Sequence, residues 1–342
     1  MTAGLIDVAS YLPPTEVGRE YFERYARPDD PLVRNPMFRA PRSRRYADRT
    51  QTAPDLIELA VGALTARHGP TVLDDVEVLI THTALPDVPF LGAGAEIARR
   101  LGLRPESIID LHNGHCAVFP YMLSLARNLL SGASTGRALL CLTQNSGRIF
   151  TQPGVRTSAH ASVIGDGAAV ALVGATGGAT ILDTEVRHHP EYAADVDIVL
   201  ADGRLYWEPG TAELDVHFDN RKAQNIIERG TVLVPDVIRA VCDRLSLATK
   251  DIDVLVTNQP NRLLLRNWSR ELGVDPARHP DTFDSYGNLF GAGMPITFDH
   301  AVRAGLVPDG SLVVFGGFAG AGELTAAAAV RWRENVQGGE SE

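Results

Sequence analysis

The sequence lacks several features that would each point to a common class of protein. Its 342 residues contain three cysteines, Cys116, Cys141 and Cys242, and their wide spacing forms neither a disulfide framework nor a zinc site. No run of about 18 apolar residues is present, so no membrane-spanning helix is expected. The first residues also lack the basic segment and long apolar stretch of a signal peptide. We therefore expect a cytoplasmic protein that holds no metal.

Positive charge is scarce as well. The formal net charge is -10 and the acidic residues are scattered, so neither a nucleic-acid surface nor an anionic-membrane surface is indicated. Arginines gather only locally, as in residues 39–45, where they suit at most a phosphate or an acidic carrier protein. Hydrophobic residues make up 44% of the chain and charged residues 22%, which suits one large globular unit or two packed domains.

Segments with strand and helix periodicity alternate in two similar series, which predicts two related α/β halves. In the first series we expect strands at 4–12, 76–81 and 139–143, a strand pair at 161–172, and helices at 53–67 and 93–101. In the second we expect strands at 180–188, 253–257 and 312–315, and helices at 220–245, 263–272 and 296–304. An Arg- and Pro-rich excursion at 16–52 either covers a site or is an insertion.

Residues 108–127 form the most informative segment. A short apolar strand is followed by a polar turn and then by apolar residues with helical spacing, so Cys116 lies at or just before the start of a buried helix. There the helix dipole and unpaired backbone N–H groups would lower the pKa of the thiol and favour the nucleophilic thiolate. Without other evidence, a single intracellular cysteine fits a small buried apolar residue of the core as well as it fits a nucleophile.

Five segments, in the right order, resemble the thiolase-like condensing enzymes and most closely β-ketoacyl-acyl-carrier-protein synthase III. They are residues 8–13, 110–121, 164–168, 286–288 with 296–305, and 316–332. The resemblance covers nearly the full chain and implies that Cys116 is the acyl-accepting cysteine. It also implies a five-layered αβαβα fold of two pseudo-repeated halves, residues 1–178 and 179–335, with a disordered tail at 336–342. The implied assembly is a symmetric homodimer.

The main departure from this family is at Asn258. The family usually reads His-Gln-Ala-Asn there, whereas this chain reads Asn-Gln-Pro-Asn at residues 258–261, and Asn288 keeps the second polar position. In the decarboxylating relatives this His and Asn hold a thioester carbonyl and stabilise the enolate that forms when malonyl loses carbon dioxide. A carboxamide donates a hydrogen bond but does not accept a proton near neutral pH. We therefore expect no decarboxylative chain extension.

Two further side chains are candidates for catalysis. His115 either assists the nucleophile or faces the core or the dimer interface. Glu323 stands where the family carries a bulky apolar residue, and an unpaired buried carboxylate is costly, so it is either paired with an arginine or close to the chemistry. The resemblance also implies a set of substrate-binding residues, namely Phe90, Gly316, Gly317 and Phe318.

Three other polar residues are interpreted as structural. His112 and His160 are expected to be histidines with satisfied hydrogen bonds rather than catalytic groups. Asp166 lies in a Gly-Asp-Gly sequence and is expected to form a turn rather than to act as an acid.

Together these features predict an acyltransferase that works through an acyl-Cys116 thioester without a bound cofactor. The oxyanion hole would combine the backbone N–H of Cys116 with one from a Gly-rich turn at 316–322. The donor would be an acyl carrier protein or coenzyme A, and the small-molecule acceptor would react through O, N or carbon near Asn258 and Asn288. Relatives in antibiotic pathways transfer acyl groups onto O or N, which suggests secondary metabolism.

Two alternatives stay open. One is a C–C bond-forming ketosynthase with an atypical polar pair. The other is a non-catalytic subunit that pairs with an active relative, although a subunit without activity has no need for a thiol at a helix start.

Overall fold

The computed structural model describes residues 3–88, 90–132, 135–193, 195–205, 207–212, 214–217 and 219–333. The main-sheet strands of the first half are β1 (Gly4–Tyr11), β4 (Val76–Thr83), β5 (Ser107–Asp110), β6 (Arg137–Gln144) and β7 (Gly167–Gly174). Its main helices are α2 (Ala53–His68), α3 (Gly94–Arg100) and α4 (Val118–Leu129).

The second half follows the same alternation. Its strands in the main sheet are β8 (Ala179–His188), β11 (Val254–Thr257), β12 (Leu312–Ala319) and β13 (Leu324–Arg331), and β9 (Asp197–Leu200) and β10 (Leu214–His217) form a separate antiparallel pair. Its main helices are α6 (Asn220–Arg244), α7 (Arg262–Leu272) and α9 (Gly293–Arg303). The boundary proposed after residue 178 falls between β7 and β8, and the tail proposed at 336–342 lies outside the described residues.

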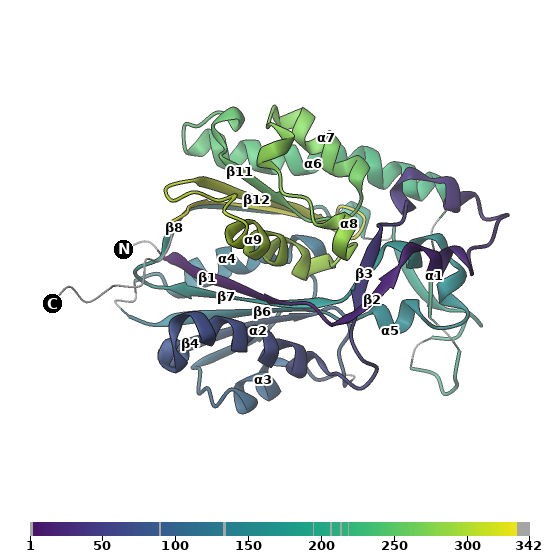
Figure 1. The fold of residues 1–342 in the computed structure, drawn as a ribbon, viewed down its shortest axis with the longest axis horizontal. Helices are drawn as coiled ribbons and strands as arrows, with labels where there is room; N and C mark the ends of the chain where they lie inside the picture. The colour runs from purple at the N-terminus through teal and green to yellow at the C-terminus, as the bar shows by residue number, and fades with distance from the viewer. Residues whose placement is uncertain are drawn as a thin grey trace.

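Two layers of strands alternate with three layers of helices (Figure 1). One strand layer contains β11, β12, β13 and β8, and the other contains β1, β7, β6, β4 and β5. A short antiparallel contact between β1 and β8 joins both layers into one nine-stranded ladder within the described residues. Helices α6 and α7 cover one outer face, α2 and α3 cover the other, and α4 and α9 lie between the strand layers (Figure 1). This is the five-layered αβαβα arrangement that we expected.

The local sequence explains where the outer helix α2 begins and ends. The hydroxyl of Thr52 accepts the N–H of Asp55 at 3.4 Å, and the Asp55 carboxylate accepts the N–H of Thr52 at 2.7 Å, which forms a capping box. The helix ends at Gly69, whose φ of 85° is readily adopted only by glycine.

Central helix α4 is apolar over most of its surface because it is covered by strands on both sides. Its buried residues include Val118, Phe119 and Met122. The ring of Phe119 meets the ring of Phe315 in β12 edge-on, with centroids 5.0 Å apart. The ring of Phe298 in α9 also meets Phe315 edge-on, with centroids 5.1 Å apart. These contacts fix the start of α4, and with it the position of Cys116.

The excursion at 16–52 folds into short elements over one end of the molecule. They are β2 (Thr15–Gly18), α1 (Arg19–Glu23), β3 (Ser43–Tyr46) and the 3-10 helices η1 (Pro31–Arg34) and η2 (Pro36–Phe38). Arg44 is fully buried, donates to the carbonyls of Ser162 and Gly18, and places its guanidinium 4.4 Å from the Phe22 ring centroid. Met37 and Phe38 line the cavity described below, so this segment covers a site.

Two local predictions are wrong. Residues 161–172 are not a strand pair, because Ala159–Val163 form the 3-10 helix η6 and only β7 is a strand. The turn expected at 316–322 is shorter, because β12 continues to Ala319. Gly316 is small for packing rather than for turning, since a Cβ there would lie 2.5 Å from Ile238 of α6.

In the part of the chain that the structure describes, no helix has both the length and the apolar character needed to cross a membrane.

Candidate active site

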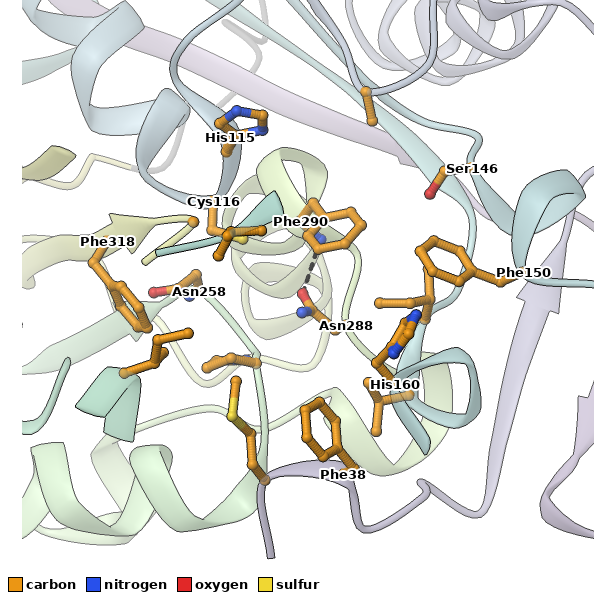
Figure 2. Close-up of a pocket in the computed structure, with 18 of the residues that line it drawn as sticks. Phe38, His115, Cys116, Ser146, Phe150, His160, Asn258, Asn288, Phe290 and Phe318 are labelled. Carbon is orange, nitrogen blue, oxygen red and sulfur yellow. Dashed lines mark hydrogen bonds between the residues drawn. The ribbon is translucent and has the colours of Figure 1, made fainter. Parts of the chain in front are cut away.

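A cavity of about 460 Å³ lies beside the start of α4 and receives side chains from both halves (Figure 2). Most of its wall is apolar or aromatic, including Phe38, Phe150, Phe290 and Phe318. The polar side chains that line it are His82, His115, Cys116, Ser146, His160, Asn258, Asn288 and Glu323. All five predicted catalytic residues line this cavity. His115 directly precedes Cys116 in the sequence, whereas Asn258, Asn288 and Glu323 come from the second half of the chain.

Cys116 lies in the 3-10 helix η4 (His115–Ala117), directly before α4, as expected. The preceding His115 has a φ of 38°, so the chain turns sharply at the nucleophile. Gly291 of η10 (Phe290–Ala292) packs against this turn. A Cβ at Gly291 would lie 2.8 Å from the carbonyl oxygen of His115 and 2.6 Å from Cγ1 of Val118, so only glycine permits the observed approach.

The protonation state of Cys116 differs from our expectation. Burial raises the pKa of the Cys116 thiol to about 12, and the nearby Glu323 carboxylate acts in the same direction. The resting cysteine is therefore a thiol rather than a thiolate. The predicted depression of its pKa is therefore wrong, and acyl transfer must include removal of the thiol proton.

Asn258 follows β11 and points into the cavity below Cys116 (Figure 2). The residue is 1% exposed, and neither Oδ1 nor Nδ2 has a hydrogen-bond partner among the described residues. Gly317 packs beside it, because a Cβ there would lie 2.8 Å from Asn258 Oδ1 and 3.2 Å from the carbonyl oxygen of Cys116. A substrate can therefore satisfy both ends of this carboxamide.

Asn288 is held by both halves of the chain. Its backbone N–H donates to Val163 at 2.7 Å and its carbonyl accepts the N–H of Gly165 at 3.1 Å. Its side-chain Oδ1 accepts the N–H of Phe290 at 3.0 Å, which is the dashed line in Figure 2. The amide group of the side chain is thereby oriented, and its Nδ2 remains as a hydrogen-bond donor for a ligand.

Glu323 lines the same cavity from the turn after β12. Its carboxylate accepts the N–H of Ala321 at 2.8 Å and makes no ion pair with any described residue. Of the two alternatives, the structure supports proximity to the cavity rather than pairing with an arginine. His115 also lines the cavity, and the residue is exposed to solvent.

The predicted substrate-binding residues separate into two groups. Phe318 lines the cavity and Gly317 packs beside Cys116 and Asn258, whereas Gly316 faces Ile238. Phe90 is 93% exposed and does not line the cavity within one chain.

The residues interpreted as structural also have defined positions. His160 lines the far end of the cavity and contacts the rings of Phe38 and Phe150 edge-on (Figure 2). The buried Asp166 carboxylate accepts the N–H of Gly147 at 2.8 Å and the N–H of Ala47 at 3.1 Å. Both contacts are those of a residue that fixes the backbone.

His82 is one of two polar cavity residues, with Ser146, that sequence reasoning missed. It lies in β4 and is 2% exposed. The available signal was a single histidine shortly after the apolar run at 78–80, which periodicity alone does not distinguish from a core residue.

The fold and the site define a thiolase-like enzyme with a cysteine at a helix start inside a largely apolar cavity. The 3-oxoacyl-[acyl-carrier-protein] synthase III profile matches residues 109–190, and the profile of its C-terminal part matches residues 242–332. The chain therefore belongs to this family, whose members are also called β-ketoacyl-acyl-carrier-protein synthase III, and is a condensing or acyl-transferring enzyme of this type.

Individual relatives agree with this assignment. The β-ketoacyl-acyl-carrier-protein synthase III of Rhizorhabdus wittichii is 30% identical over 264 residues, which cover 75% of this chain and 77% of that protein. The fold is shared with 3-oxoacyl-(acyl carrier protein) synthase III of Pseudomonas aeruginosa, with a TM-score of 0.81, 22% identity and coverage of 98% and 99%. It is shared equally with the priming β-ketosynthase of the R1128 polyketide pathway, with a TM-score of 0.81, 21% identity and coverage of 97% of both chains.

The contact at Gly291 yields a first prediction. Gly291→Ala should displace the turn that carries Cys116 and slow its acylation, because the new Cβ meets backbone at 2.8 Å. Gly293→Ala is the matched control, since a Cβ there meets its nearest atoms at 3.8 and 3.9 Å. Intact mass spectrometry after exposure to acetyl-coenzyme A gives the loading rate of each variant. Equal rates for Gly291→Ala and the wild type would contradict the proposed constraint.

The three buried cysteines yield a second prediction. Cys116 alone lines the cavity, whereas Cys141 and Cys242 lie in β6 and α6. Cys116→Ala should abolish acyl-enzyme formation, while Cys141→Ala and Cys242→Ala should keep it. Peptide mapping of the acylated wild type identifies the modified residue, and turnover by Cys116→Ala would exclude the covalent mechanism.

Proposed function

We propose that this chain is an acyltransferase of the ketosynthase III type that works without malonyl decarboxylation. The acyl group passes from an acyl carrier protein or coenzyme A to Cys116 and then to a small-molecule acceptor that reacts through O, N or carbon. The backbone N–H of Cys116, with one from residues 316–322, stabilises the tetrahedral intermediate. We place the reaction in the cytoplasm. We also place it in natural-product metabolism, and the similarity in fold to a priming polyketide ketosynthase supports this second assignment.

The observation that carries the proposal is the unpaired carboxamide of Asn258 beside Cys116. Asn258 and Asn288 together supply neutral hydrogen-bond donors to the cavity. Such donors orient a carbonyl or an acceptor group, but neither takes up a proton at neutral pH. Among the described residues that line the cavity, Glu323 is the only aspartate, glutamate, lysine or arginine. The cavity wall therefore contains no lysine or arginine to stabilise an enolate.

The alternative with specific support is a C–C bond-forming β-ketoacyl synthase. The relatives named above carry that activity in their names, and one of the two matching family profiles covers residues 109–190, which include Cys116. A non-catalytic partner subunit is the weaker alternative, because Cys116 lines a cavity that is large enough for an acyl group.

Asn258 decides between the two enzymatic alternatives. Asn258→Ala should slow transfer from the preformed acyl-enzyme by roughly ten- to a thousand-fold, the scale for one preorganised hydrogen-bond donor, with little change in loading. Asn288→Ala should behave similarly, and Glu323→Gln should matter only where the acceptor loses a proton. Carboxyl-labelled malonyl thioester distinguishes the two reactions. Release of labelled carbon dioxide together with product formation would contradict our proposal and support the ketosynthase.

The assembly is the remaining part of the proposal. We expect a symmetric homodimer, with the exposed Phe90 segment as a candidate for the interface. Light scattering at micromolar concentration should give the mass of two chains, and a Phe90→Ser variant should dissociate more readily. A stable wild-type monomer under these conditions would contradict the dimer.

A further inference from the structure

The imidazole of His82 has a fixed tautomer. Its Nδ1 lies 2.8 Å from the carbonyl oxygen of Leu111, at the start of the polar turn that leads to Cys116. Because a carbonyl only accepts, Nδ1 carries the hydrogen and donates it. In the neutral ring, Nε2 is then left with a lone pair and can only accept a hydrogen bond.

This lone pair has no partner. Nε2 of His82 is buried and makes no hydrogen bond within the described part of the chain, to Cys116 or to any other residue. Among the side chains that line the cavity, only His82 and Asn258 bury polar atoms that are unpaired in this way. Since an unsatisfied buried acceptor destabilises a fold, these two positions mark where a ligand would supply hydrogen bonds.

The ring cannot turn away from the cavity easily. A Cβ on Gly291 would lie 2.8 Å from Cδ2 of His82, so η10 packs directly against the imidazole. The ring of His115 meets it edge-on with centroids 6.1 Å apart. His82 and the turn carrying Cys116 thus share the same packing partner, Gly291.

The surroundings keep His82 uncharged. Burial lowers the pKa of its imidazole to about 4, and the nearby imidazoles of His115 and His112 act in the same direction. At neutral pH the ring is therefore a hydrogen-bond acceptor, while the thiol of Cys116, with a pKa of about 12, holds its proton firmly. A proton taken up by His82 is readily passed on to a Cys116 thiolate.

We propose that Nε2 of His82 accepts the hydrogen bond and then the proton of the acceptor's nucleophilic group, which makes the acceptor a hydroxyl or an amine rather than a carbanion. This inference rests on the proposed acyltransferase function and deepens it. A protic group supplies the hydrogen that Nε2 lacks, whereas a carbanion has none to donate there.

The step balances without any further reagent. The acceptor oxygen or nitrogen forms a bond to the acyl carbon as its proton moves to Nε2 of His82. The C–S bond to Cys116 then breaks, the electron pair leaves on Sγ, and the proton passes from Nε2 to that sulfur. The products are an ester or amide, the Cys116 thiol and neutral His82.

The test uses the full-length protein and separates loading from transfer. Cys116 is first acylated with acetyl-coenzyme A, and the loss of the acyl group is followed by intact mass spectrometry. Water and ethanol serve as weak nucleophiles that need a base, whereas hydroxylamine attacks a thioester without one. In the reverse direction the same step takes the proton from the Cys116 thiol, so the variants should load more slowly. Each protein is therefore incubated until acylation is complete, and release is compared between equally acylated proteins.

Two variants form a matched pair. His82→Asn places an amide N–H2 near the position of Nδ1 and preserves the bond to Leu111, whereas His82→Gln places an amide near Nε2 that cannot take up a proton. Both should slow release to water and to ethanol by about 10²- to 10⁴-fold, the usual contribution of a general base. Release by hydroxylamine should be nearly unchanged in both.

Several results would overturn the inference. They are wild-type release to water and ethanol no faster than that of a free acetyl-cysteine thioester, a wild-type rate in His82→Asn, or an equal loss of rate with hydroxylamine. A wild type that never acylates Cys116 would instead refute the proposed acyltransferase function itself. The two failures are therefore distinguishable.

Discussion

The site depends on the close approach of two glycines to the turn that carries the nucleophile. Gly291 meets the carbonyl of His115, and Gly317 meets the carbonyl of Cys116, so two segments of the second half touch the backbone of the first. A Cβ at either position would press against the facing backbone and push the two halves of the chain apart. Because Asn258 and Asn288 come from the second half, this close packing sets their distance from Cys116.

The cavity retains polar groups that the folded chain does not satisfy. His82 and Asn258 together bury three nitrogen or oxygen atoms without partners. Each such atom costs about 1–3 kcal/mol, which is a substantial share of the stability of an ordinary domain. Burial of Cys116 as a thiol adds a reactive group that also lacks a strong partner. The site is thus less stable than an apolar core of the same volume, and ligand contacts offset that cost.

The sequence predicted the parts of this site that depend on local pattern and order along the chain. The helix start at Cys116 follows from apolar spacing, and the cavity brings Asn258, Asn288 and Glu323 to it as the family resemblance implied. The pKa of Cys116 could not be predicted, because desolvation comes from residues distant in sequence. The role of His82 was equally hidden, since its tautomer is set by a carbonyl on the neighbouring strand.

Charge balance connects the missing family histidine to the proposed chemistry. Decarboxylation moves the negative charge of the malonyl carboxylate onto an enolate, and the described cavity wall contains two carboxamides and the Glu323 carboxylate but no lysine or arginine to hold that charge. Transfer to a hydroxyl or amine also creates an oxyanion, yet the proton released in the same step can reside on the imidazole of His82, so positive and negative charge arise together. In a low-dielectric cavity such a pair is far less costly than a single ion. The exchange of histidine for asparagine at position 258 and the placement of a neutral imidazole in β4 therefore favour the same class of reaction.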